Sequence, residues 1–338
     1  MQKTSTDSTI ALSGPTMGAR WSVLMDEGTV DTDLKSRLQC AVDEVDAQMS
    51  TWRPESDLMR LNAAPLDTWV ALPEQLLTVL SAGLAISRQT GGAFEMNIGD
   101  AVRAWGFGPG SIELGAIRTA SATRRVPATE GLELDIFNRR ARKSAAMALD
   151  LSGIAKGYGV DRLAETARNL GVASALCAID GEVRATGLRR NGRPWAVAVE
   201  MPEEGASSPH SLLTLEELAV ATSGDYRHFV TVGKARLSHT MDPRRGAPLV
   251  AAPASVTVLS QACMLADAMA TALMVMGQGR GLEFAKDHAI SALFLDRTAG
   301  GMTAMGTGAF ATTGKPKAPQ GSHLRDLSSR QDLGRNTD

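Results

Sequence analysis

The chain has 338 residues, with 35 basic and 37 acidic side chains and a formal net charge of −2. This near balance excludes a whole-chain field of the kind that recruits nucleic acid or an anionic membrane. Aromatic residues make up only 4% of the chain, and its three cysteines are isolated in sequence, so neither base-stacking platforms nor a disulfide framework is expected.

The hydrophobic pattern predicts an α+β fold. Helices are predicted over residues 30–49, 73–88, 155–170 and 263–276, the last of them ending at Gly277. Strands are predicted over residues 175–179, 195–199, 254–259 and 291–295. Helices and strands do not alternate strictly, and hairpin-like spacing recurs between residues 176 and 199. Largely antiparallel sheets are therefore favoured over a doubly wound parallel sheet.

Both ends of the chain are predicted to be disordered, which leaves a single folded domain over residues 10–312. Residues 1–9 are polar, and residues 313–338 are rich in charged, Ser, Pro and Gln residues. Such compositions bury too little apolar surface to offset the entropy lost on ordering. The sequence as given contains no membrane-spanning run and no secretory signal. A cytoplasmic protein is expected, or an exported one whose signal is missing from this sequence.

Two segments predict an oxygen-ligand site for a hard cation beside a polar loop. His239 and Asp242 lie on a short turn closed by a proline and a glycine. Asp267 and Thr271 are spaced i, i+4 in a predicted helix, which places a carboxylate and a hydroxyl on one face. These donors suit a hard cation and phosphate chemistry. The same residues also fit an ordinary surface turn followed by an acid near a helix start.

Three more segments carry chemical information. The glycine-rich residues 150–159 run from a strand end into a helix start, where backbone N–H groups can approach an anion. This segment is neither a Walker loop nor a GxGxxG fingerprint. Around Phe94 and around Trp52, the sequence offers an aromatic surface for a flat heterocycle, although both residues also fit as core anchors.

Taken together, these segments resemble the ApbE family, the FAD:protein FMN transferases. The resemblance runs from about residue 14 to residue 310 and rests on six blocks in the same order, namely residues 16–18, 49–54, 92–95, 150–158, 239–246 and 266–277. It implies two similar, intimately packed halves with antiparallel sheets covered by helices, related to the T-fold. It also implies Mg²⁺-dependent cleavage of FAD, with the FMN part moving to a Thr or Ser hydroxyl of a partner flavoprotein and AMP leaving.

The resemblance assigns roles to individual residues. It implies that the FAD-binding residues are Met17, Trp52, Ala93, Phe94, Glu95, Ser152, Tyr158 and Met241. It implies that the Mg²⁺ ligands are Asp267, Thr271 and the backbone carbonyl of Ala155. His239 is assigned acid–base or orienting work at the acceptor hydroxyl, since a hydroxyl nucleophile must lose its proton. The alternative for His239 is a structural turn histidine.

The chain departs from the family pattern at three places. Glu95 stands where many relatives have Asp, and Trp52 replaces the commoner tyrosine. The lipoprotein cysteine of exported relatives is absent from this sequence, although many family members act on the periplasmic side of the inner membrane. The longer Glu95 side chain would reposition its contact to the flavin or adenine, and Trp52 keeps the stacking plane but loses the hydroxyl. Only the third departure bears on biology, through the cellular compartment.

Two other functions fit the same residues. An FAD pyrophosphatase would use the same cation and pocket but give the FMN part to water. A non-catalytic flavin-binding protein would use the pocket alone. The paired Asp267 and Thr271 argue against the second alternative, because a pure binding protein has little need of a cation at the pyrophosphate.

Overall fold

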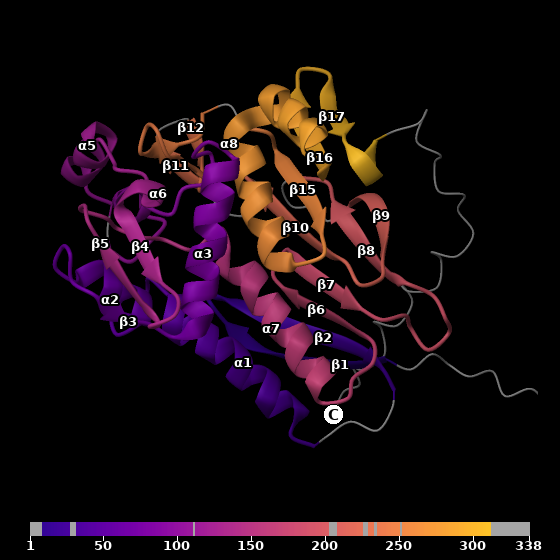
Figure 1. Cartoon of the computed structure of the whole chain (residues 1–338). Helices are drawn as coiled ribbons and strands as arrows, with labels where there is room; N and C mark the ends of the chain where they lie inside the picture. Colours follow the sequence, from indigo (N-terminus) through magenta and orange to yellow (C-terminus); the bar gives the residue numbers. More distant parts are fainter. Residues whose placement is uncertain are drawn as a thin grey trace, which may run out of the picture.

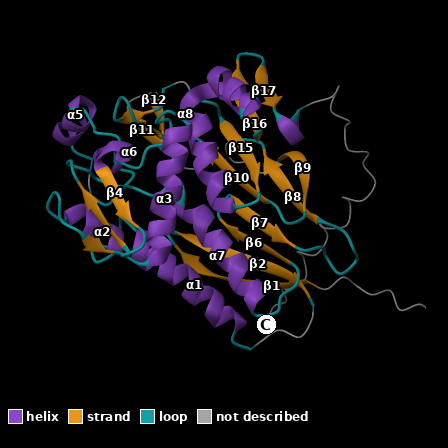
Figure 2. Ribbon diagram, in the orientation of Figure 1, coloured by secondary structure: helices purple, strands orange, loops and turns teal. Residues whose placement is uncertain are grey.

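The computed structural model of the chain describes residues 9–27, 32–110, 112–202, 208–225, 229–232, 235–250 and 252–311. Its centre is an eight-stranded antiparallel sheet with helices packed on one face (Figures 1 and 2). In spatial order, the strands are β1 (Thr9–Thr16), β2 (Ala19–Asp26), β6 (Ala175–Ile179), β7 (Glu182–Thr186), β10 (Ala219–Gly224), β15 (Ser255–Ser260), β16 (Ser291–Thr298) and β17 (Gly301–Gly306). The α+β prediction is therefore confirmed.

The remaining elements are short sheets and helices around this centre. The small sheets are β3 (Val70–Ala71) with β5 (Arg140–Lys143) and β4 (Leu132–Asp135), β8 (Trp195–Glu200) with β9 (Pro209–Leu215), β11 (Phe229–Val232) with β12 (Ala235–Ser238), and β13 (Met241–Asp242) with β14 (Ala247–Pro248). The helices are α1 (Leu34–Met49), α2 (Asp57–Ala63), α3 (Glu74–Gln89), α4 (Gly99–Ala104), α5 (Leu114–Ala122), α6 (Ala128–Gly131), α7 (Ala155–Asn169), α8 (Cys263–Asp287) and the 3₁₀ turn η1 (Gly308–Phe310). None of the helices in the described part of the chain combines the length and hydrophobicity needed to cross a membrane.

The large sheet consists of two consecutive units with the same topology. In the first, the hairpin β1–β2 is followed by helix α7 and the hairpin β6–β7. In the second, the pair β10–β15 is followed by helix α8 and the hairpin β16–β17. In each unit, the strand before the helix pairs antiparallel with the strand after it. This arrangement provides the two similar halves that the family resemblance implies.

The sequence predictions agree closely with several elements. Strand β6 has the predicted bounds, and β8, β15 and β16 overlap their predicted segments. Helix α1 begins at Leu34, and the predicted start at residue 30 lies outside the described residues. The predicted end at Gly277 is a kink, because Gly277 has a left-handed φ of 74° and a second helical segment follows it. The predictions for residues 1–8 and 312–338 also lie outside the described residues.

The hairpin β1–β2 was missed by the sequence analysis. On β2, the alternating Trp21, Val23 and Met25 are all buried against α1 and α7, a period of two that is typical of a half-buried strand. A two-residue turn joins the strands, and both Met17 (φ 45°) and Gly18 (φ 72°) have left-handed backbones. Methionine is an uncommon residue in that conformation, so the usual sequence signal for a tight hairpin was absent.

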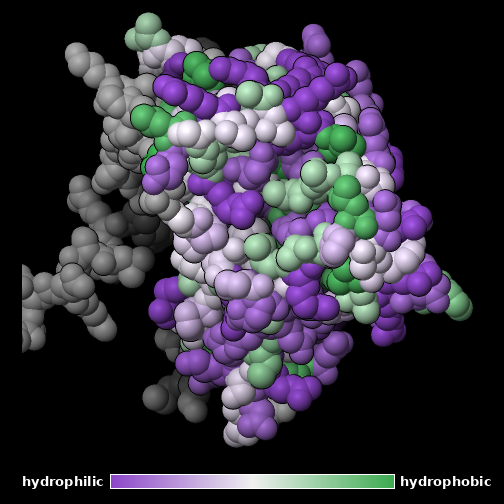
Figure 3. Space-filling view, turned by 90° about the vertical axis from the view of Figure 1, so that its left-hand side faces the viewer, coloured by the Kyte–Doolittle hydropathy of each residue, from purple (hydrophilic) through white to green (hydrophobic). Residues whose placement is uncertain are grey.

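The two faces of the sheet are covered differently. Helices α1, α7 and α8 cover one face (Figure 2). The hairpin β8–β9 packs on the other, where Trp195 and Leu215 join Ala185 and Val220 in a small buried cluster. On the side that carries α5 and the β4–β5 hairpin, hydrophobic residues lie in small groups between hydrophilic ones (Figure 3).

The crossing of α7 and α8 is held by a carboxylate from each helix. Asp161 of α7 is buried, and its two oxygens accept from the first amides of α8, those of Cys263 and Met264, each at 2.9 Å. In return, Asp267 of α8 accepts from the Gly157 amide in the first turn of α7 at 2.9 Å. Each helix therefore satisfies N-terminal amides of the other, which would otherwise lack partners inside the helix.

Gly157 permits this close crossing. A Cβ at position 157 would lie 2.5 Å from the carbonyl oxygen of Cys263 and 2.8 Å from the Cβ of Asp267. Both contacts are too short for a real side chain, so a glycine is required where the two helices touch.

Asp161 should be a major stabilising residue. Asp161→Ala removes the acceptor of two helix amides and of the Arg184 guanidinium, which donates to Asp161 at 2.6 Å. We expect the free energy of unfolding to fall by about 3 kcal/mol, as measured by urea unfolding. Glu165→Ala is the matched control on the same helix, because its ion pair with Arg162 is half exposed. It should change stability by less than about 1 kcal/mol. Similar losses in the two variants would contradict the capping role.

Candidate active site

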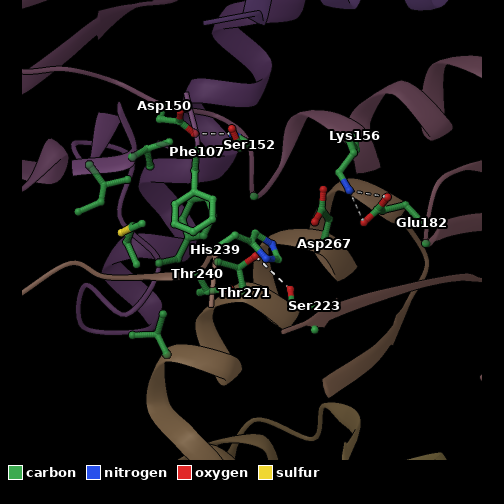
Figure 4. Close-up of a pocket in the computed structure, with 18 of the residues that line it drawn as sticks. Phe107, Asp150, Ser152, Lys156, Glu182, Ser223, His239, Thr240, Asp267 and Thr271 are labelled. Carbon is green, nitrogen blue, oxygen red and sulfur yellow. Dashed lines mark hydrogen bonds and ion pairs between the residues drawn. The ribbon is translucent and has the colours of Figure 1, made fainter. Parts of the chain in front are cut away.

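A cavity of about 500 Å³ lies where the two halves meet (Figure 4). Its walls come from the β1–β2 and β6–β7 turns, the start of α7, the end of β10, the segment after β12, the middle of α8 and the segment around α4. Of the residues assigned by resemblance, those that line it are Met17, Ala93, Phe94, Glu95, Ser152, His239, Met241, Asp267 and Thr271. Segments that are distant in sequence therefore meet at one cavity.

Three assigned residues do not line the cavity. The Trp52 side chain is exposed, at 63% of its full area. Tyr158 packs against the core, and burial raises its pKa to about 12. Ala155 is buried as the first residue of α7, beside Lys156, which does line the cavity. The assigned roles of these three residues stay predictions.

Asp267 and Thr271 lie one helical turn apart on the face of α8 that borders the cavity. The Asp267 carboxylate is fixed by the bond from the Gly157 amide to its Oδ2. The Thr271 hydroxyl lies 3.3 Å from the Ser223 hydroxyl at the end of β10. Gly153 packs closely here, because a Cβ at that position would lie 3.0 Å from the Thr271 Oγ1 atom. The two oxygen donors are therefore held in place by both halves of the molecule.

Among the described residues, no three His, Cys, Asp or Glu side chains gather as a metal cluster. The donor set assigned by resemblance contains one carboxylate, with a hydroxyl and a backbone carbonyl as its neutral members. Oxygen donors of this kind suit Mg²⁺ better than Zn²⁺.

An ion pair that the sequence analysis missed lies next to Asp267. The Lys156 ammonium is 3.1 Å from the Oε2 atom of Glu182 (Figure 4). It is also 3.5 Å from the Oδ2 atom of Asp180. Burial lowers the pKa of Lys156, but the charges of Glu182, Asp267 and Asp180 outweigh burial and raise it overall. Burial also raises the pKa values of Glu182 and Asp267, and the Lys156 charge opposes this effect.

The cavity lining also includes apolar side chains, namely Phe94, Ile98, Val102, Phe107, Met241 and Val275. In Figure 4, His239 and Phe107 lie away from Lys156 and Glu182. The His239 ring is edge-on to the Phe107 ring, with ring centroids 6.3 Å apart and an interplanar angle of 63°. A flat heterocycle suits such walls, while the oxygen-rich end suits phosphate groups through a cation.

The segment that carries His239 is anchored at its far end. The Trp105 indole donates to the carbonyl of Gly246 at 3.1 Å. Gly246 has a left-handed φ of 57°, and a Cβ there would lie 2.5 Å from the carbonyl oxygen of Ala120. The Asp242 side chain accepts from the Arg244 amide at 3.0 Å within this turn, and Asp242 is not among the described residues that line the cavity.

The segment before α7 is held by side chains that imitate backbone pairing. Asn62 donates to the carbonyl of Leu149 at 2.9 Å and accepts from its amide at 2.8 Å. Asp150 then accepts from the Ser152 amide at 2.8 Å, which turns the chain into the helix. The glycine-rich segment predicted to approach an anion therefore enters the cavity wall in a fixed conformation.

Glu95 both lines the cavity and holds its wall together. Its Oε1 atom accepts from the Asn97 amide at 2.8 Å and from the Ala128 amide, the first of α6, at 3.0 Å. The assignment of this residue to FAD binding stays a prediction, while the two amide bonds give it a structural role.

The fold matches those of flavin transferases of known structure. The flavin transferase ApbE from Vibrio cholerae superposes with a TM-score of 0.79 at 33% identity, covering 90% of this chain and 98% of the other. The apo flavinyl transferase ApbE from Pseudomonas stutzeri gives a TM-score of 0.78 at 33% identity, with 90% and 96% covered. These likenesses extend through both halves of the sheet.

The chain belongs to the ApbE family, whose model matches residues 17–294. A Vibrio cholerae relative named FAD:protein FMN transferase is 35% identical, over 89% of this chain and 91% of the relative. A relative of the same name from Haemophilus influenzae is 32% identical, over 89% and 90%.

The buried Glu95 carboxyl should make stability depend on pH. Burial raises its pKa above the usual value, despite the bonds from the Asn97, Ala128 and Met96 amides. The native state therefore holds this proton more tightly than the unfolded chain does. As pH rises through the native pKa, the wild type should lose stability relative to Glu95→Gln, which keeps an acceptor oxygen but carries no charge. Urea unfolding of both proteins between pH 4 and pH 8 measures the difference.

Glu95→Ala distinguishes the effect of the Glu95 charge from the effect of its hydrogen bonds. It removes the acceptor of the Asn97 and Ala128 amides and should destabilise the protein at every pH. If the difference between the wild type and Glu95→Gln stays constant with pH, the carboxyl has an ordinary pKa in the native state.

Proposed function

We propose that this protein transfers the FMN part of FAD to a hydroxyl group of a partner protein and releases AMP. The observation that carries the proposal is the single cavity in which apolar walls adjoin the oxygen donors of Asp267 and Thr271. Relatives named FAD:protein FMN transferase support this reaction, since they are similar to the chain over about nine-tenths of its length.

The cavity has complementary regions for the parts of FAD. Phe94, Phe107 and Met241 offer apolar surface to a flat ring system. The pyrophosphate belongs at the oxygen-rich end, where backbone amides at the start of α7 also approach the cavity. FAD is the substrate in this arrangement, and it is consumed at each turnover.

Mg²⁺ fits the donors at this end. Asp267 uses Oδ2 to accept from the Gly157 amide, which leaves Oδ1 for the cation. The Thr271 hydroxyl follows one turn along α8, and the Ala155 carbonyl lies at the start of α7. When bound, Mg²⁺ supplies positive charge to the pyrophosphate as AMP leaves. The helix crossing thus sets the position of the donors before any substrate binds.

His239 is the residue in the cavity best suited to accept a proton. The acceptor oxygen, from a Thr or Ser of the partner, forms a bond to the FMN phosphorus as its proton passes to the imidazole. The bond between that phosphorus and the bridging oxygen breaks, and AMP leaves with the bridging oxygen. A hydroxyl held against the phosphorus has a large proximity advantage over water, which favours transfer over hydrolysis.

The test is incubation with FAD, Mg²⁺ and a candidate flavoprotein subunit, followed by intact-mass measurement. We expect covalent flavin and AMP in equal amounts, and neither product when the acceptor Thr or Ser is replaced by Ala. Asp267→Asn keeps an acceptor for the Gly157 amide but removes the charge, and should lower turnover at least about 100-fold while FAD still binds. Rapid FMN release that is unaffected by a partner would make the protein a pyrophosphatase.

His239→Ala should slow transfer by about 100-fold, the usual scale of general acid–base help, while FAD binding is retained by fluorescence titration. His288→Ala is the matched control. Its ring stacks on Phe284 at 4.0 Å near the end of α8, and it is not among the described residues that line the cavity. Transfer at the wild-type rate in His239→Ala would assign this histidine to the turn alone.

A further inference from the structure

The charges around the cavity are strongly unbalanced. The carboxylates that line it are Glu95, Asp150, Asp180, Glu182 and Asp267. Lys156 is the only lysine or arginine among the described residues that line it. A substrate with an anionic pyrophosphate therefore meets a single fixed positive side chain, placed among negative ones.

Lys156 cannot turn freely into solvent. Its ammonium lies 3.1 Å from the carboxylate of Glu182, whose side chain is only 4% exposed, and the side chain of Lys156 itself is 29% exposed. In Figure 4, Lys156 and Asp267 project from neighbouring helices toward the same part of the cavity. Glu182 thus holds the ammonium beside the carboxylate that is assigned to the cation.

A fixed charge in this position acts oppositely on the two ligands of the site. It repels a divalent cation that approaches Asp267, and it attracts the pyrophosphate of FAD. Because Glu182 and Asp267 are buried and Lys156 is largely so, these interactions are weakly screened. Lys156 should therefore weaken cation binding to the FAD-free site, and the negative charges of the pyrophosphate should offset this repulsion once FAD is bound.

We propose that Lys156 is a resident counter-charge that weakens binding of the divalent cation to the FAD-free site and strengthens binding of FAD. The inference rests on the proposed function, because it takes the Asp267 site as the cation site. Lys156 is a positioning residue in this scheme, and its contribution appears in binding before any chemistry occurs.

The experiment measures two affinities without turnover. Mn²⁺ replaces Mg²⁺ as the probe, and its binding to the FAD-free protein is followed by electron paramagnetic resonance. FAD binding to the cation-free protein is followed by flavin fluorescence. In Lys156→Gln, we expect Mn²⁺ to bind at least about fivefold tighter and FAD at least about fivefold weaker, at the lower end of typical coupling between sites. Lys156→Arg should restore both affinities toward the wild-type values.

Two control variants distinguish failure of the Lys156 proposal from failure of the proposed function. Lys286→Gln removes the same charge from the exposed end of α8 and should change neither affinity. Asp267→Ala should abolish Mn²⁺ binding, and if it does not, the cation site of the proposed function is wrong. If Asp267→Ala loses Mn²⁺ but the two affinities of Lys156→Gln fail to move in opposite directions, the counter-charge role is overturned.

Discussion

The reciprocal bonding of α7 and α8 is the constraint on which the rest of the structure depends. Asp161 satisfies the first amides of α8, and Asp267 satisfies an amide in the first turn of α7. Both helices therefore begin at fixed points above the sheet, and Gly157 lets them approach closely. The donors at the cavity take their positions from this crossing, so the stability of the fold and the geometry of the site rest on the same bonds.

This arrangement gives Asp267 two tasks with one carboxylate. One oxygen accepts from the Gly157 amide of α7, and the other is the oxygen that the proposed function assigns to the cation. A carboxylate fixed in this way need not be reoriented when a ligand binds, which lowers the cost of forming the site. The nearby Glu182 and Lys156 form a second fixed pair, so the polar end of the cavity is assembled before any substrate enters.

The sequence revealed the parts of this site that depend on local spacing. The i, i+4 relation of Asp267 and Thr271 and the bounds of β6 follow from short-range periodicity, and the structure agrees with both. The partnership of Lys156 with Glu182 could not be predicted from spacing, because it depends on α7 lying over the β6–β7 turn. The capping by Asp161 was missed for the same reason, since its partners lie about a hundred positions away. The order of the family motifs, and not periodicity, indicated the two halves.

The two halves also differ in where they carry extra chain. In the first half, only two residues join β1 to β2, and the long insertion, residues 27–154, lies between β2 and α7. In the second half, the long insertion, residues 225–254, lies between β10 and β15, and only two residues join β15 to α8. The repeated core supplies the charged groups at Lys156, Glu182 and Asp267, and the insertions supply the apolar walls and His239. Changes in the inserted segments would therefore alter the apolar wall while leaving Lys156, Glu182 and Asp267 in place. The duplicated scaffold thus carries the charged groups of the cavity, and the two inserted segments carry most of its apolar wall.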